Sequence, residues 1–194
     1  MHLTSPSEPA RIVDKELFDW LTDLRPQTQI PRQSRAFVRI DVCHRAYWHA
    51  LFDICPQLLK IAAPDGLAIL RPFMTWAETQ NLTFDWSFYL WVYEWLKQSE
   101  FQDRIDNDLL ITMMGASAAR WGNYDRTPAC GLVLASAEAS EIVVAWKCRT
   151  ASGRREIEII DLEEPLPPPE ESFGFFTLPS FELAPFPGWR NIPR

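Results

Sequence analysis

Apolar residues in the first two thirds of the chain recur at the spacing of a helix. After Ser34, a suitable N-cap residue, they lie three or four positions apart at Ala36, Ile40, Cys43, Tyr47, Leu51 and Ile54, which is the helical period. The run FVRIDV within this segment also alternates well enough to form a strand. Similar patterns predict helices from Asp14 to Pro26 and over 56–63, 67–79 and 100–118, with strain or a restart at Pro72.

The stretch FDWSFYLWVYEWL, residues 84–96, carries seven aromatic side chains. Wound into a helix over 84–98, the rings point in every radial direction, and a helix that is apolar all round is normally enclosed. Its thirteen residues include Asp85 and Glu94 and fall short of the ~20 that a membrane span needs. We therefore expect this helix in the core of the fold, and not as an exposed sugar or cation platform.

After Pro128 the apolar pattern takes the period of a strand. The segments GLVLAS (131–136), EIVVAWKCRT (141–150) and RREIEIIDLE (154–163) predict three antiparallel strands. Ser152 and Gly153 suit a two-residue hairpin turn between the last two.

That turn predicts a register for the hairpin. Lys147 and Arg149 would face Glu158 and Glu156 on one side of the sheet. On the other side the pairs would be apolar, Trp146 with Ile159 and Cys148 with Ile157. Paired opposite charges on one face and apolar pairs on the other suit a half-buried sheet.

The fold predicted from these patterns is α+β. Five or six helices over residues 13–119 would pack on a three-stranded antiparallel meander over 130–163, within one domain of residues 1–164. The stiff segment EEPLPPPEE would lead into an extended Pro/Phe-rich tail, 165–194. Because disordered segments are poor in aromatic residues, we expect this tail to pack on the domain or on a partner.

The net charge of −7 is unevenly spread. Eight acidic residues and no Lys or Arg lie between Glu156 and Trp189, whereas five arginines lie between Arg25 and Arg45 with Asp41 as the only acid. An acidic chain is not expected to bind nucleic acid, which needs clustered basic residues. The acidic part either meets water, docks on the arginine-rich part, or attracts a basic partner.

The usual motifs of catalysis and cofactor binding are missing from the sequence. There is no Walker-type loop, GxGxxG, CxxC pair or HExxH, so no cofactor or metal is expected. Cys130 and Cys148 could lie opposite one another in the first hairpin, but no histidine follows them that would complete a zinc site. The only histidines after the leader are His44 and His49.

The strongest candidate for a binding site is the connection between the helices and the sheet. It contains Trp121, Tyr124, Asp125 and Arg126, and Trp, Tyr and Arg are the residue types enriched at interaction hot spots. The alternative is that Trp121 and Tyr124 fill the seam between helices and sheet. A second candidate is the acidic group Glu163, Glu164, Glu170 and Glu171, which would attract a basic partner.

The sequence therefore favours a non-catalytic, cytoplasmic protein-binding module that acts through an acidic surface, by analogy with inhibitors of the immunity type. One alternative is a scaffold subunit that inserts its Pro/Phe-rich tail into a neighbour. Another is a hydrolase or transferase with His44 or His49 as base and Asp41 or Asp53 as orienting group. No secretion signal is recognisable at the start of the sequence.

Overall fold

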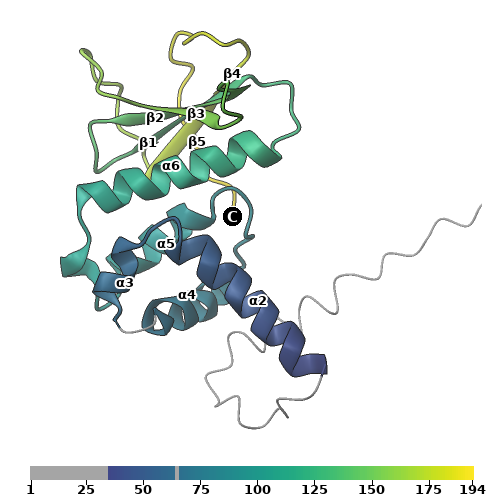
Figure 1. The fold of residues 1–194 in the computed structure, drawn as a ribbon. Helices are drawn as coiled ribbons and strands as arrows, with labels where there is room; N and C mark the ends of the chain where they lie inside the picture. Colours follow the sequence, from purple (N-terminus) through teal and green to yellow (C-terminus); the bar gives the residue numbers. More distant parts are fainter. Residues whose placement is uncertain (1–34, 64–65) are drawn as a thin grey trace, which may run out of the picture. The chain divides into compact units, whose positions relative to one another are not determined.

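The computed structural model describes residues 35–63 and 66–194 (Figure 1). The chain divides into two compact units, Met1–Thr79 and Gln80–Arg194, and each is described by itself. The predicted leader and the helix after Asp14 lie outside the described residues. The assignment of one domain to residues 1–164 stays a prediction.

The described part of the first unit is helical. It contains α2 (Arg35–Phe52), α3 (Gln57–Ile61) and α4 (Leu67–Thr79). These helices confirm the periodicity argument, and the strand alternative for FVRIDV is wrong. Helix α4 continues through Pro72 without a break.

The second unit begins with the aromatic helix α5 (Phe88–Lys97), in which eight of ten residues are buried. Its predicted place in the core is thereby confirmed. The helix starts later than expected because the Asp85 carboxylate accepts hydrogen bonds from the backbone N–H and hydroxyl of Ser87, at 2.8 and 2.6 Å. This turn leaves Trp86 outside the helix.

A short 3-10 helix, η2 (Gln102–Arg104), precedes α6 (Asn107–Tyr124). The Asp106 side chain caps α6 by accepting from the backbone N–H of Leu109 at 2.8 Å. The prediction ended this helix at Ala118, six residues too early. Its buried stripe continues through Trp121 and Gly122 because these lie three and four positions after Ala118, on the same face.

The predicted three-stranded meander is wrong, because the sheet has five antiparallel strands in the order β3-β2-β1-β4-β5. The first three strands lie where the sequence places them. The other two come from the supposed extended tail. The strands are β1 (Gly131–Ser136), β2 (Ile142–Arg149), β3 (Arg155–Ile160), β4 (Phe173–Leu178) and β5 (Arg190–Asn191).

Both faces of the sheet are covered, which explains why β1 is buried at every position. On one face Phe175 and Phe173 contact Trp86 and Tyr93, with ring centroids 5.3 and 6.0 Å apart, and α6 crosses the sheet (Figure 1). On the opposite face the chain that follows β3, which we call the C-terminal segment, packs against a cluster around Phe176. Its contacting residues include Leu162, Leu166, Phe186 and Trp189.

The C-terminal segment is anchored at Gly174 in β4. The Trp189 indole N–H donates to the Pro167 carbonyl at 2.6 Å, and its ring lies 5.4 Å from that of Phe176. A Cβ on Gly174 would stand 2.9 Å from Trp189 and 3.0 Å from Pro169. Only glycine lets the segment approach this closely.

The predicted register of the last hairpin is also wrong. Trp146 pairs with Glu156, and the register shifts between Trp146 and Arg149. The Trp146 indole N–H donates to Glu158 at 3.3 Å, so this ring shares a face with the acids. Because both faces of β2 are covered at 142–146, the charge alternation that guided the prediction does not decide the register.

Candidate binding site

Two adjoining hollows lie beside the C-terminal end of α6. The first, of about 510 Å³, has Trp86, Trp121, Asp125, Phe175 and Arg190 among its lining residues. The second, of about 420 Å³, shares Trp86 and Asp125 and adds Phe84, Asp85, Arg120, Tyr124 and Arg126. We call the two together the aromatic groove.

The walls of the aromatic groove are held by cations packed on rings. Arg120 lies 5.6 Å from the Phe88 ring centroid and 5.9 Å from that of Tyr124, and it donates to the Phe84 carbonyl at 3.0 Å. The guanidinium of Arg190 lies 5.1 Å from the Phe175 ring. These contacts keep rings and positive charge side by side along the groove.

Lys147 of β2 fixes the Trp121 wall of the groove. Its ammonium lies 5.0 Å from the Trp121 ring centroid and 2.6 Å from Oδ2 of Asp125. Burial by itself raises the pKa of Asp125, but hydrogen bonds from Lys147 and Thr127 outweigh it and lower that pKa below its ordinary value.

A separate pocket of about 410 Å³ lies in the same unit and is lined mainly by acidic and aromatic side chains. We call it the acidic pocket. Its lining includes Trp91, Glu94, Glu170, Glu171, Phe173 and Arg194. Three carboxylates against one guanidinium leave these side chains with a net charge of −2. The pocket is therefore suited to positive charge.

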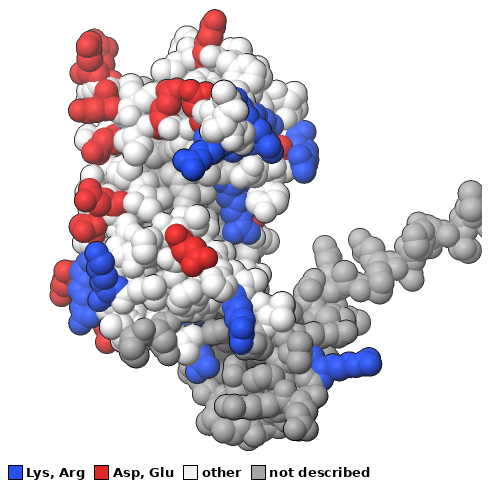
Figure 2. Space-filling view, in the orientation of Figure 1, with Lys and Arg blue, Asp and Glu red and all other residues white. Residues whose placement is uncertain are grey.

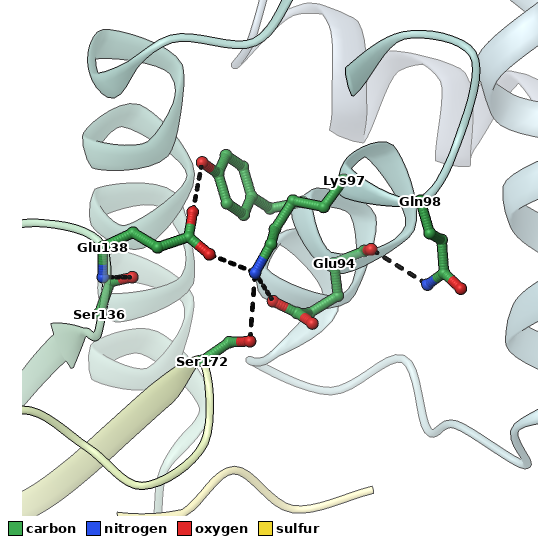
Figure 3. Close-up of polar contacts among 7 residues, drawn as sticks. Glu94, Lys97, Gln98, Ser136, Glu138 and Ser172 are labelled. Carbon is green, nitrogen blue, oxygen red and sulfur yellow. Dashed lines mark hydrogen bonds and ion pairs between the residues drawn. The ribbon is translucent and has the colours of Figure 1, made fainter. Parts of the chain in front are cut away.

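A polar network borders the acidic pocket (Figure 3). Lys97 contacts Glu94 at 3.3 Å, forms an ion pair with Glu138 and donates to Ser172 Oγ at 3.3 Å. Tyr93 donates its hydroxyl proton to Glu138 at 3.3 Å. Burial, together with the Glu138 carboxylate, raises the pKa of Tyr93 to about 12. The network ties α5 to the turn after β1 and to the start of β4.

The structure brings the four predicted residues of the helix–sheet connection to one place. Trp121 and Asp125 line the first hollow, and Tyr124, Asp125 and Arg126 line the second. Trp121 is buried whereas Tyr124 is 68% exposed. The alternative that these side chains fill the seam between helices and sheet therefore holds for Trp121 but not for Tyr124. That these residues bind a partner stays a prediction.

The four predicted glutamates are not all together. Glu170 and Glu171 line the acidic pocket, and Glu171 accepts from the Asn191 amide at 3.0 Å. Glu163 and Glu164 are exposed. All eight acids between residues 156 and 182, which we call the acidic segment, are exposed. In Figure 2, acidic side chains gather along one side of the sheet-bearing part of the view and basic ones on the other.

Sequence reasoning missed Trp86, Trp91, Phe175 and Arg190 as lining residues. Trp86 and Trp91 were assigned to the core with the rest of the aromatic helix. The Asp85–Ser87 turn is the signal that would have placed Trp86 outside that helix. Phe175 and Arg190 come to the groove only through pairing of β4 with β1 and β5.

The structure contains one of the two histidine–carboxylate pairs that the alternative of a histidine-dependent enzyme requires. His49 Nδ1 lies 3.0 Å from Asp53 Oδ2, with both side chains about 60% exposed. Cys55, two residues after Asp53 in the sequence, has a buried thiol whose burial raises its pKa to about 12, so it is a poor nucleophile. The His44 and Asp41 side chains lie outside the described part. The pair thus has a base and an orienting group, without an activated thiol.

The two cysteines of the sheet do not face each other. Cys130 lies opposite Lys147, whose N–H donates to its carbonyl at 2.9 Å, whereas the Cys148 thiol donates to Glu156 at 3.1 Å. In the described ranges 35–63 and 66–194, no group of three or more His, Cys, Asp or Glu side chains is arranged to hold a metal ion. No helix of the described residues could cross a membrane. A cytoplasmic location stays a prediction.

Comparison with known proteins identifies a family. No curated protein matches the chain. A family model described as "Methanobactin biosynthesis cassette protein MbnC-like" matches residues 27–193, which include both hollows of the aromatic groove and nearly all of the acidic pocket. Since this match covers most of the sequence, the chain belongs to the MbnC-like family.

Proposed function

We propose that the protein is a non-catalytic protein-binding component of a methanobactin biosynthesis cassette, and that it holds another protein or peptide made by the same cassette. The family description supports the link to biosynthesis. The family description favours a role in biosynthesis over the immunity-type role that the acidic charge of the sequence suggested. The binding activity is argued from the surface of the second unit.

The aromatic groove is the observation that carries the proposal. It sets an exposed Tyr124 and an exposed Arg126 beside the fixed ring of Trp121. Tyr, Trp and Arg dominate binding energy at protein interfaces because they bury large areas and still offer polar contacts. Contacts from Arg120 and Lys147 hold the walls in place, so little side-chain entropy is lost on binding.

The negative charge of the acidic segment favours a basic partner. Its eight carboxylates are exposed, and a surface of one sign attracts an oppositely charged partner over a distance of about a Debye length. We expect this attraction to raise the association rate more than it slows dissociation, because exposed charges are screened by salt.

The scaffold alternative receives less support. It needs the rings of the C-terminal segment to insert into a neighbour, but Phe186 and Trp189 contact Phe176 of the same chain, with ring centroids 5.8 and 5.4 Å apart. Phe181 and Leu183 remain exposed. They are the part of the segment that a neighbour could still contact.

The test is co-purification with the other products of the same cassette. The full chain is tagged and co-expressed with each product, and bound product is quantified. We expect one product to be retained. Tyr124→Ala with Arg126→Ala should weaken its binding by about tenfold or more, since truncated hot-spot residues cost roughly 2 kcal/mol.

Two controls make the result specific. Arg154→Ala removes an exposed arginine in the β2–β3 turn and should leave binding unchanged. The triple change E163Q/E164Q/E170Q is compared with E100Q/D103N/D108N, which removes the same charge from exposed sites outside the acidic segment. The change within the acidic segment, E163Q/E164Q/E170Q, should slow association at low salt more than the change outside it. The proposal fails if no cassette product is retained, or if the groove variant binds as tightly as the arginine control.

A further inference from the structure

Two arginines lie directly opposite one another near the turn of the β2–β3 hairpin. Arg149 of β2 pairs with Arg155 of β3 in the register of the sheet, and like charges at opposite positions repel one another. The Arg155 guanidinium donates to Asn123 Oδ1 at 3.1 Å and to the Lys147 carbonyl. Both acceptors are uncharged, so these contacts fix the guanidinium in place without neutralising it.

Arg126 extends this positive charge to the aromatic groove. It lies between Asp125 and Thr127 in the sequence, and both of these neighbours contact the ammonium of Lys147. Arg126 also lines the second hollow of the groove. We call these three arginines, Arg126, Arg149 and Arg155, the basic strip. The strip is therefore continuous with the site proposed above.

The positive charge of the basic strip is not compensated by the described residues. The ion pairs of ranges 35–63 and 66–194 do not include its three arginines. The carboxylates next to it in the sequence are already engaged, since Asp125 pairs with Lys147 and Glu156 accepts from the Cys148 thiol at 3.1 Å. Arg126 and Arg149 are exposed. The strip is thus suited to bind an anion from outside the chain.

The surroundings favour protein carboxylates over nucleic acid as that anion. Guanidinium groups bind carboxylates and phosphates equally well in geometry. A long polyanion, however, would be repelled by the eight exposed carboxylates of the acidic segment in the same unit. The Trp121 ring of the groove is buried, so it offers no open face on which a base could stack. A short acidic stretch of a protein avoids both difficulties.

We propose that the protein segment that occupies the aromatic groove carries acidic residues, and that their carboxylates pair with the basic strip. The inference rests on the proposed protein-binding function and adds the charge of the segment at this end of the groove. The acidic segment would contact a different, basic part of the same partner.

The test measures peptide binding to the full chain by fluorescence anisotropy at low salt. The probe is the rhodamine-labelled peptide Gly-Trp-Gly-Glu-Asp-Glu-NH₂, which offers one ring to the groove and three carboxylates to the strip. We expect saturable binding that weakens as salt is added. The isosteric peptide Gly-Trp-Gly-Gln-Asn-Gln-NH₂ should bind about tenfold more weakly or worse, because each exposed ion pair contributes a factor of a few.

Two arginines of the same hairpin provide a matched pair of variants. R149Q should raise the Kd of the acidic peptide about threefold, and R126Q/R149Q should raise it about tenfold. Both positions are exposed, so folding is expected to be retained. R154Q removes the same charge from an exposed position outside the strip and should leave the Kd unchanged. Equal effects of R149Q and R154Q would overturn the proposal, because the attraction would then be non-specific.

Other outcomes would also overturn it. These are equal binding of the uncharged peptide, the lack of saturable binding, or tighter binding of rhodamine-labelled octathymidine, which would assign the strip to nucleic acid. Retention of a cassette product equally by the parent and by R149Q would refute this inference alone. The expected peptide pattern without any retained product would refute the proposed function and leave the strip as a site for acidic segments.

Discussion

Lys147 and Asp125 form an ion pair at the end of α6, with Nζ 2.6 Å from Oδ2 and both side chains less than a fifth exposed. The same ammonium donates to the Thr127 carbonyl at 2.6 Å and lies over the Trp121 ring. One cation from β2 therefore holds the last turn of the helix and one wall of the aromatic groove.

Replacing Lys147 by Met should lower the free energy of unfolding by about 1–3 kcal/mol, because Asp125 loses its cation while it remains largely shielded from water. Urea denaturation followed by tryptophan fluorescence measures the change. Lys60→Met removes an exposed lysine and should stay within about 0.5 kcal/mol of the parent. Equal effects of the two substitutions would contradict the role of the pair.

The lowered pKa of Asp125 predicts a dependence of stability on pH. A carboxyl with a depressed folded-state pKa stabilises the fold above its unfolded pKa, about 4, and loses this contribution as the pH falls through the folded-state value. The stability gap between the parent and Asp125→Asn should thus be full at pH 7 and shrink at pH values below about 4. Urea midpoints across this range check it, and a gap that stays constant would refute it.

Gly174→Ala should destabilise the second unit by roughly 1–3 kcal/mol, because the added methyl group meets Trp189 and Pro169. Gly115→Ala is the matched control, since a Cβ there meets nothing within 4 Å and alanine favours the helix by up to about 1 kcal/mol. Thermal unfolding should order the proteins as Gly115→Ala, parent, Gly174→Ala. Any other position for Gly174→Ala would show that the C-terminal segment is not packed as described.

Burial that raises the pKa of Cys55 to about 12 should protect this thiol from alkylation. At pH 8 only about one molecule in ten thousand would carry the thiolate. Iodoacetamide labelling followed by peptide mass analysis should therefore leave Cys55 unmodified in the native protein and modify it in urea. Rapid native labelling would revive the histidine-dependent enzyme, because His49 would then have a reactive thiol nearby in the sequence.

The periodicity of apolar residues suffices to predict those helices and strands whose packing partners are near in the sequence. The stripe from Ala36 to Ile54 and the strand segments from 131 to 163 each carry their own periodicity, and the corresponding helix and strands are confirmed. Of the two strands that were missed, β4 pairs with β1, although the segment that contains β2 and β3 separates them in the sequence. Nothing within FGFFTL distinguishes a strand inserted beside β1 from a hydrophobic tail.

The same distinction applies to the candidate site. Trp121, Tyr124 and Arg126 lie within one short stretch of the sequence, so composition alone singled them out. The opposing wall, with Phe175 and Arg190, is assembled by long-range pairing, which periodicity does not encode. Glu170 and Glu171 were chosen for their charge, while the pocket that gives them a shape depends on Trp91 of a helix far away in the sequence.

The order of strands has a consequence for synthesis on the ribosome. Strand β1 lies between β2 and β4, so its second edge stays open until residues 173–178 have left the exit tunnel. During that interval an apolar strand edge is available to other nascent chains, which is a recognised route to aggregation. Translation speed near codons 165–178 should therefore influence the yield of correctly folded protein.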